Sequence, residues 1–238
     1  MAPRNGNRQD PRVREIFFDD RESLAESLAS SIADSLYGTL TGRPRASLVV
    51  SGGSTPRPLF KALQGLELPW LQVDVTLADE RWVDAEHDAS NERFVRTELL
   101  ADLAASAHFL PLKSEKASPE EGGPEIEAKL RRLLPFDVTV LGMGGDGHTA
   151  SLFPDDPQID DRLASDALCV AARPPSQPLP RLSLTPKALW TSRRLVLHIT
   201  GQDKLDVYRR ALQPGPVSEL PIRAFLRGPT PIDVYWAP

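Results

Sequence analysis

The feature that most limits the fold of this chain is an alternation of short apolar segments with segments of helical periodicity. The apolar segments, which predict buried strands, are 46–50, 73–83, 136–144, 193–200 and 232–238. The segments that predict helices are 24–36, 58–66, 90–103, 125–134 and 203–212. Because parallel strands are joined by crossover helices, this order predicts an α/β fold with a mostly parallel, twisted sheet and helices on both faces.

A single domain is expected to hold this sheet. At 238 residues, the chain lies in the range in which α/β folds often stay undivided. We expect a flexible arm over residues 1–14, where the sequence is polar, and one α/β domain over residues 15–238. The arm lacks the apolar core of a signal peptide, and no apolar run approaches the roughly 20 residues of a membrane span. The sequence therefore predicts a soluble, cytoplasmic protein.

Charge and cysteine content argue against several kinds of partner, disulfide and metal site. The net charge is −5, and no block of basic residues occurs, so neither nucleic acid nor a membrane is an expected partner. The only cysteine, Cys169, is expected to be buried and unreactive, and it cannot form an internal disulfide. No cluster of histidine, cysteine and acidic residues has the spacing of metal ligands, so we expect neither a metal nor another cofactor.

Polar and glycine-rich segments occur where the predicted strands end. These segments are 51–56, 79–82, 142–148 and 201–204. In open parallel sheets, ligands bind beyond the carboxyl ends of the strands, which meet at one edge. The sequence therefore predicts a ligand site that these segments build together.

Segment 142–147 contains the pattern G-x-G-x-x-G, which also occurs in dinucleotide-binding folds. That use of the pattern requires a long helix from the third glycine and an acidic residue about 20 positions further on, after another strand. Here Pro154 follows Gly147 too soon for a long helix, and Asp160 and Asp161 lie in a polar stretch with no strand before them. The pattern therefore does not predict a dinucleotide site.

His148 directly follows these glycines and lies between Asp146 and Thr149. Histidine has an ordinary pKa of about 6.5, which suits proton transfer near neutral pH. A loop histidine can instead serve local structure alone, but the position at a strand end favours catalysis. We predict that His148 and Asp146 are catalytic, and the sequence leaves open which residue orients His148. His198, within segment 193–200, is expected to have a structural partner.

Segment 51–56, with the sequence SGGSTP, lies between a predicted strand and a predicted helix. Its successive amides at Gly52 and Gly53, with the hydroxyls of Ser54 and Thr55, suit a phosphate group. An ordinary turn can have the same composition, and no Gly-Lys-Ser/Thr sequence follows, as a Walker loop requires. Isolated cations near other strand ends are Arg81, Arg181 and Lys204. Each of these fits a surface ion pair as well as a phosphate.

Together, these segments resemble the 6-phosphogluconolactonase family. The motifs SGGSTP, ADERWV, SNERFVRTELL, GMGGDGHTASLFP, PRLSLT and TGQDK occur in that family's order and spacing, over about residues 45–226. Of these motifs, GDGHTASLFP is the most specific. The sequence SLTPKAL departs from the family, which more often has leucine before the proline. The resemblance implies a Rossmann-like fold and hydrolysis of 6-phospho-D-glucono-1,5-lactone in the oxidative pentose phosphate pathway.

The resemblance also implies roles for individual residues. His148 matches the family's catalytic histidine, and Arg81 and Lys204 match its phosphate-side cations. The remaining substrate- or phosphate-binding positions are Gly52, Gly53, Ser54, Thr55, Asp79, Asn91, Gly144, Gly145 and Arg181. Lactone hydrolysis needs a base for the attacking water, donors for the carbonyl oxygen and an acid for the leaving oxygen. One histidine can act as both base and acid, and backbone amides of segment 142–147 are candidate donors.

Two other functions fit the same fold. A glucosamine-6-phosphate deaminase has a related Gly-Asp-Gly-His element, but its motif continues differently from TASLFP and it needs an acidic residue to take the C2 proton. A non-catalytic sugar-phosphate sensor usually carries a DNA-binding segment, and the first 45 residues contain neither a helix-turn-helix pattern nor a basic patch. The expected ligand is therefore a small phosphosugar lactone, and the sequence identifies no protein partner.

Overall fold

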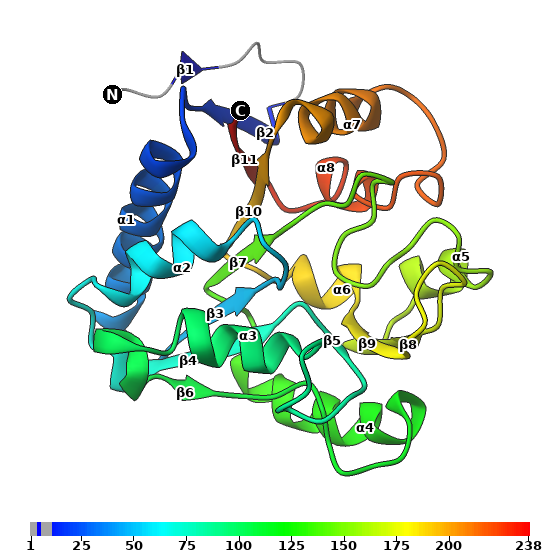
Figure 1. Ribbon diagram of the computed structural model, residues 1–238, viewed down its shortest axis with the longest axis horizontal. Coiled ribbons are helices and arrows are strands. Elements are labelled where there is room, and N and C mark those ends of the chain that lie inside the picture. The colour runs from blue at the N-terminus through cyan, green and yellow to red at the C-terminus, as the bar shows by residue number, and fades with distance from the viewer. Residues whose placement is uncertain (1–3, 6–10) are drawn as a thin grey trace.

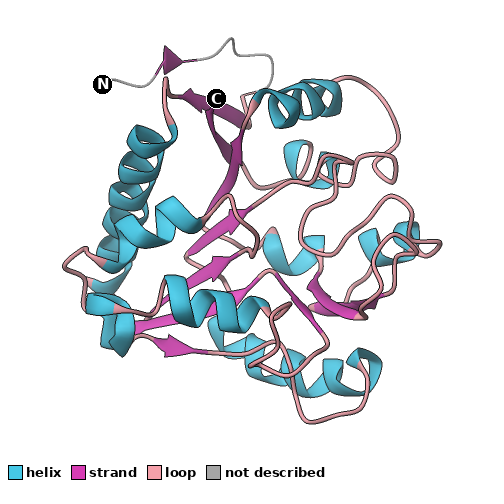
Figure 2. Cartoon of the chain, viewed as in Figure 1, coloured by secondary structure: helices cyan, strands magenta, loops and turns pink. Residues whose placement is uncertain are grey.

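The central sheet is almost entirely parallel (Figures 1 and 2). The computed structural model describes residues 4–5 and 11–238. In spatial order, the strands are β1 (Arg4–Asn5), β2 (Val13–Phe17), β11 (Ile232–Ala237), β10 (Arg194–Thr200), β7 (Val138–Leu141), β3 (Ala46–Val50), β4 (Val73–Leu77) and β6 (His108–Phe109). Within the described part of this sheet, only β1 and β2 pair antiparallel. The fold class predicted from the sequence is confirmed.

Helices lie on both sides of this sheet. The α-helices are α1 (Arg21–Leu40), α2 (Arg57–Gln64), α3 (Asn91–Glu98), α4 (Pro119–Leu130), α5 (Ile159–Leu163), α6 (Pro186–Leu189), α7 (Gln202–Leu212) and α8 (Arg223–Leu226). Figure 1 shows α1 and α2 to the left of the strands and α6, α7 and α8 to the right. Every residue of β3, β4 and β7 is buried between these layers, which explains why their sequences are nearly continuous apolar runs.

The amino-terminal boundary differs from the expected one. Strand β2 begins at Val13, whose side chain is buried, so the boundary expected after residue 14 falls inside a strand. Residues 1–3 and 6–10 of the expected arm lie outside the described residues. The sequence VREIF was missed as a strand because it is short and its charged residues hide its apolar ones. It pairs in parallel with β11 and extends the sheet.

The strand predicted over 73–83 is wrong in one respect, because it divides at Ala78. Its second part is β5 (Asp79–Arg81), which leaves the central sheet and joins β9 (Arg181–Leu184) and β8 (Cys169–Ala172) in a small antiparallel sheet. In this sheet Arg81 lies opposite Arg181. The division brings two cations that are 100 positions apart in sequence to the same place.

The parallel strands end at one edge of the central sheet, and the glycine-rich segments follow there. Segment 51–56 continues from β3 and segment 142–148 from β7, while Gly201 connects β10 to α7. Buried apolar side chains from both sheets belong to one continuous hydrophobic core. No helix within the described ranges is long and apolar enough to cross a membrane.

Candidate active site

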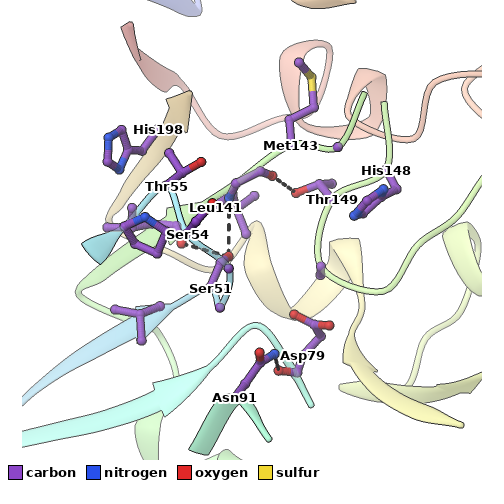
Figure 3. A pocket seen from close by; sticks show the side chains of 18 of the residues that line it. Ser51, Ser54, Thr55, Asp79, Asn91, Leu141, Met143, His148, Thr149 and His198 are labelled. Atoms are coloured by element: carbon purple, nitrogen blue, oxygen red, sulfur yellow. Dashed lines mark hydrogen bonds between the residues drawn. The ribbon is translucent and has the colours of Figure 1, made fainter. Parts of the chain in front are cut away.

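A pocket of about 280 Å³ opens at this edge of the sheet (Figure 3). It is small for a ligand pocket, so it suits a compact molecule. The predicted site residues that line it are Gly52, Gly53, Ser54, Thr55, Asp79, Arg81, Asn91, Gly144, His148, Arg181 and Lys204. Gly145 and Asp146 do not line it but lie directly behind it, against Lys204 and His148 respectively. Residues predicted from separate segments are thus brought together.

His148 is held by a carboxylate. Its Nδ1 lies 2.6 Å from Oδ1 of Asp146, and its backbone N–H donates to the same oxygen at 3.1 Å. The ring also stacks on Phe153, with centroids 4.1 Å apart. A histidine whose Nδ1–H donates to a carboxylate keeps Nε2 free to accept a proton. The question that the sequence left open, which residue orients His148, is therefore answered by Asp146 and Phe153.

Asp146 is suited to this contact because it stays ionised. Partial burial would raise the pKa of Asp146, but the hydrogen bond and the charge of His148 outweigh burial and lower the pKa below its ordinary value. An ionised partner stabilises the imidazolium that forms when His148 takes up a proton. The pair thus has the arrangement of a general base with its orienting carboxylate.

The close packing of this pair requires glycine at position 144. A β-carbon on Gly144 would lie 2.1 Å from Nδ1 of His148 and 2.6 Å from Oδ1 of Asp146. The Gly144 N–H also donates to the carbonyl oxygen of His148 at 2.9 Å, which closes the loop on itself. The backbone therefore passes so close to the pair that no side chain fits between them.

If His148 is the base for the expected lactone hydrolysis, Gly144→Ala should displace its ring and lower kcat by about a hundredfold, the scale for misplacing a catalytic group by about 1 Å. The free energy of unfolding and kcat are the measurements. Gly38→Ala is the matched control, since nothing lies within 4 Å of its β-carbon position in α1. The control should retain wild-type kcat. An unchanged kcat in Gly144→Ala would show that the ring position is not critical.

The SGGSTP loop forms another wall of the pocket. Ser51 is fixed by β7, because its Oγ donates to the Val140 carbonyl at 3.2 Å and accepts from the Gly142 N–H at 3.3 Å. A β-carbon on Gly52 would lie 1.9 Å from Oδ1 of Asn91, so the loop and Asn91 are in close contact. The loop leads into α2, and helix N-termini attract anions.

Glu80 organises the adjoining wall, a role that the sequence did not indicate. Its carboxylate is buried and accepts the backbone N–H groups of Arg81, Asn91 and Glu92 at 2.7 to 2.8 Å. These bonds fix the start of α3 to β5. In consequence, Nη1 of Arg81 can donate to Oδ1 of Asn91, while Nδ2 of Asn91 donates to the Asp79 carbonyl at 2.8 Å.

The pocket contains three cations although the chain is acidic overall. Arg81 and Arg181 lie side by side on β5 and β9, and Lys204 lies in the first turn of α7. Arg181 is buried, and Nη1 lies 3.7 Å from Oδ2 of Asp79. Burial lowers the pKa of Arg181, although the Asp79 charge opposes this. One carboxylate facing three cations leaves the pocket with excess positive charge.

Two further observations concern residues beyond the predicted set. Ser151 Oγ donates to Oδ2 of Asp79 at 2.5 Å and thereby links the 142–154 loop to β5. His198 lines the pocket, yet its Nδ1 has no hydrogen-bond partner among the described residues. The prediction of a structural partner for His198 is therefore wrong for Nδ1.

Within the described part of the chain, no three histidine, cysteine or acidic side chains come together as metal ligands.

The fold and the pocket define a class: Rossmann-like α/β proteins with a ligand site at the carboxyl edge of the sheet. The model of the family described as glucosamine-6-phosphate isomerases/6-phosphogluconolactonase matches residues 19–236. The chain belongs to this family, which confirms the resemblance seen in its motifs.

Individual relatives are similar over nearly their whole length. The 6-phosphogluconolactonase of Rhizobium meliloti (strain 1021) is 41% identical, with 93% of this chain and 97% of that protein covered. The crystal structure of a 6-phosphogluconolactonase from Shewanella baltica OS155 has a TM-score of 0.92 and 46% identity, covering 94% and 97% of the two chains. A monomeric glucosamine-6-phosphate deaminase, at a TM-score of 0.76 and 18% identity over 94% and 96% of the chains, shares the fold.

Proposed function

We propose that this protein hydrolyses 6-phospho-D-glucono-1,5-lactone to 6-phospho-D-gluconate, the second step of the oxidative pentose phosphate pathway. The observation that carries the proposal is one small pocket with His148, held from behind by Asp146, in one wall and a glycine-rich loop and cations in the others. Relatives with the name 6-phosphogluconolactonase support the choice of substrate. The cytoplasmic location expected from the sequence belongs to the same proposal.

In the proposed reaction, His148 acts first as a base. Nε2 takes a proton from a water molecule as the water oxygen attacks C1 of the lactone, and Asp146 stabilises the imidazolium that results. The tetrahedral intermediate then collapses, and the C1–O5 bond breaks. His148 returns the proton to the departing ring oxygen. One residue thus serves both proton transfers, and no covalent bond between the substrate and the protein is needed.

Negative charge develops on the C1 carbonyl oxygen during the attack. The Gly142, Gly144 and Gly147 amides of the glycine loop already donate to Ser51 Oγ, to the His148 carbonyl and to the Gly144 carbonyl. They are therefore poor candidates for oxyanion donors. The amide of Met143, which lines the pocket, makes no hydrogen bond to any described residue. We assign an oxyanion contact to this amide.

The phosphate group is assigned to the walls formed by the SGGSTP loop and the three cations. Gly52, Gly53, Ser54 and Thr55 offer amides and hydroxyls, and Arg81, Arg181 and Lys204 supply positive charge. Asp79 and Asn91 are assigned to the sugar hydroxyls and to holding these cations. Binding energy from the phosphate would hold C1 against His148, which is how a remote group raises a rate.

The test is an assay with freshly prepared lactone. The protein should accelerate conversion of the phosphorylated lactone well above its spontaneous rate. Glucosamine 6-phosphate, the substrate of the deaminase alternative, should release no ammonia under the same conditions. Ammonia release without lactone hydrolysis would replace the proposal by the deaminase. Binding of sugar phosphates without turnover of either substrate would favour the sensor.

Asp146→Asn should lower kcat by at least about tenfold, because the amide does not fix the Nδ1–H tautomer of His148. The amide cannot stabilise the imidazolium, so the rise of kcat/KM with pH should move to lower pH. A pH–rate profile from pH 5 to 8 measures both effects. Asp203→Asn, which removes an exposed carboxylate beside Lys204, is the matched control. An Asp146→Asn profile identical to that of the wild type would contradict the proposed orienting role.

A further inference from the structure

His198 has an unusual position for a residue within a buried strand. It lies near the carboxyl end of β10, its side chain is 4% exposed, and its ring lines the pocket. Nδ1 is buried without a hydrogen-bond partner among the described residues. Leaving a buried nitrogen unpaired is unfavourable, so the ring has an unmet hydrogen bond at the wall of a ligand pocket.

The ring faces the layer that contains the SGGSTP loop. Arg194, four positions earlier on β10, donates to the Ser31 carbonyl of α1 at 2.6 Å, so even-numbered side chains of this strand point toward α1. Helix α2, which follows Thr55, packs on α1. Figure 3 shows His198 and Thr55 toward one end of the pocket and His148 toward the other. His198 is therefore remote from the proton-transfer pair and near the proposed phosphate loop.

The charge state of His198 suits a neutral donor. Burial lowers the pKa of His198 to about 4, so the ring is uncharged at neutral pH. A neutral imidazole carries one N–H and one acceptor nitrogen. No carboxylate contacts the ring within the described residues, so nothing in the protein competes for its N–H. A phosphate oxygen, which accepts only, is a fitting partner for this N–H.

We propose that His198 is a specificity residue that donates a hydrogen bond from its neutral ring to the phosphate group of the ligand. This inference rests on the proposed function and deepens it. Lysine and arginine attract a phosphate as charges, whereas a buried neutral donor requires an acceptor at one position. His198 would thus favour the phosphorylated lactone over its unphosphorylated counterpart.

Kinetics of three variants test this inference. His198→Phe keeps the ring volume without a donor, while His198→Asn places an amide nitrogen near the Nδ1 position and His198→Gln near the Nε2 position. We expect His198→Phe to raise KM for 6-phosphogluconolactone by roughly tenfold to a hundredfold, the value of a hydrogen bond to a charged group. Its kcat, and its kinetics on gluconolactone, should stay within about twofold of the wild type. One of the two amide variants should restore most of the loss.

Val196→Ala is the matched control, because Val196 is buried on the same face of β10 but does not line the pocket. It should lower the free energy of unfolding without changing KM. An unchanged KM in His198→Phe would overturn the inference. It would indicate that His198 serves packing or binds a structural water. Equal losses on both lactones, or a loss that neither amide variant relieves, would overturn it as well.

A binding measurement separates this inference from the proposed function. Inorganic phosphate should raise the Tm of the wild type more than that of His198→Phe at equal concentration, whether or not any lactone is hydrolysed. If the wild type hydrolyses no lactone but this difference persists, the proposed function fails and the role of His198 stands. Equal shifts in both proteins would remove the role of His198 even if the wild type is an active lactonase.

Discussion

Replacing His148 by asparagine should lower kcat for 6-phosphogluconolactone by about 10²- to 10⁴-fold, the usual contribution of general acid–base catalysis. Asparagine can still donate to Asp146 but cannot take up a proton from water. Because the side chain lies in a loop at the pocket, the free energy of unfolding should change little. Single-turnover and steady-state assays of the purified variant, corrected for spontaneous hydrolysis, measure the loss.

His87→Asn is the control for this variant. His87 is an exposed loop histidine whose ring accepts the Ala89 N–H at 3.0 Å, and it does not line the pocket. Its kcat should equal that of the wild type. In the wild type, kcat/KM should rise as the pH increases, because only an unprotonated histidine can act as the base. A near wild-type kcat in His148→Asn, or a flat pH profile, would contradict the assignment of the base.

Removing one cation from the pocket should weaken transition-state binding by roughly 1.5–3 kcal/mol, the range for hydrogen bonds to charged groups. Arg81→Ala and Lys204→Ala should show this loss with 6-phosphogluconolactone and almost none with unphosphorylated gluconolactone. The double variant should lose less than the sum of the single losses, because one phosphate contacts both cations. The measurement is kcat/KM for the wild type and these three variants on both lactones.

Arg173→Ala is the control for a general charge effect, since Arg173 is exposed and pairs with Glu120 on the surface. It should behave as the wild type on both substrates. Equal losses on the two lactones in Arg81→Ala and Lys204→Ala would mean that the phosphate binds elsewhere. Strictly additive losses would mean that the two cations act on different groups.

The sheet could be predicted because burial on both faces leaves a clear trace in sequence. Strands β3, β4 and β7 have no exposed residue, so their sequences are mostly apolar. In strand β2, Arg14 is exposed and only Val13 and Ile16 are buried, so its sequence indicates a strand less clearly. Strand β9 follows a proline-rich stretch and pairs with β5 about 100 positions away, while β8 pairs with β9. Such long-range pairing has no local signature.

The residues of the site were predictable where glycine or a charged side chain follows a buried strand. That rule found Gly144, His148 and Lys204. It could not find Glu80, whose function is to accept backbone N–H groups from a helix that the sequence does not place near it. It also misjudged His198, because a histidine inside an apolar run looks the same whether or not the protein supplies its partner.

The most direct test of the central claim is a crystal structure of the protein with 6-phosphogluconate, the proposed product. We predict that the C1 carboxylate lies within hydrogen-bond distance of Nε2 of His148, near the amide of Met143. The phosphate should lie against residues 52–55 and Lys204. A product bound in the reverse orientation, or outside this pocket, would contradict the account.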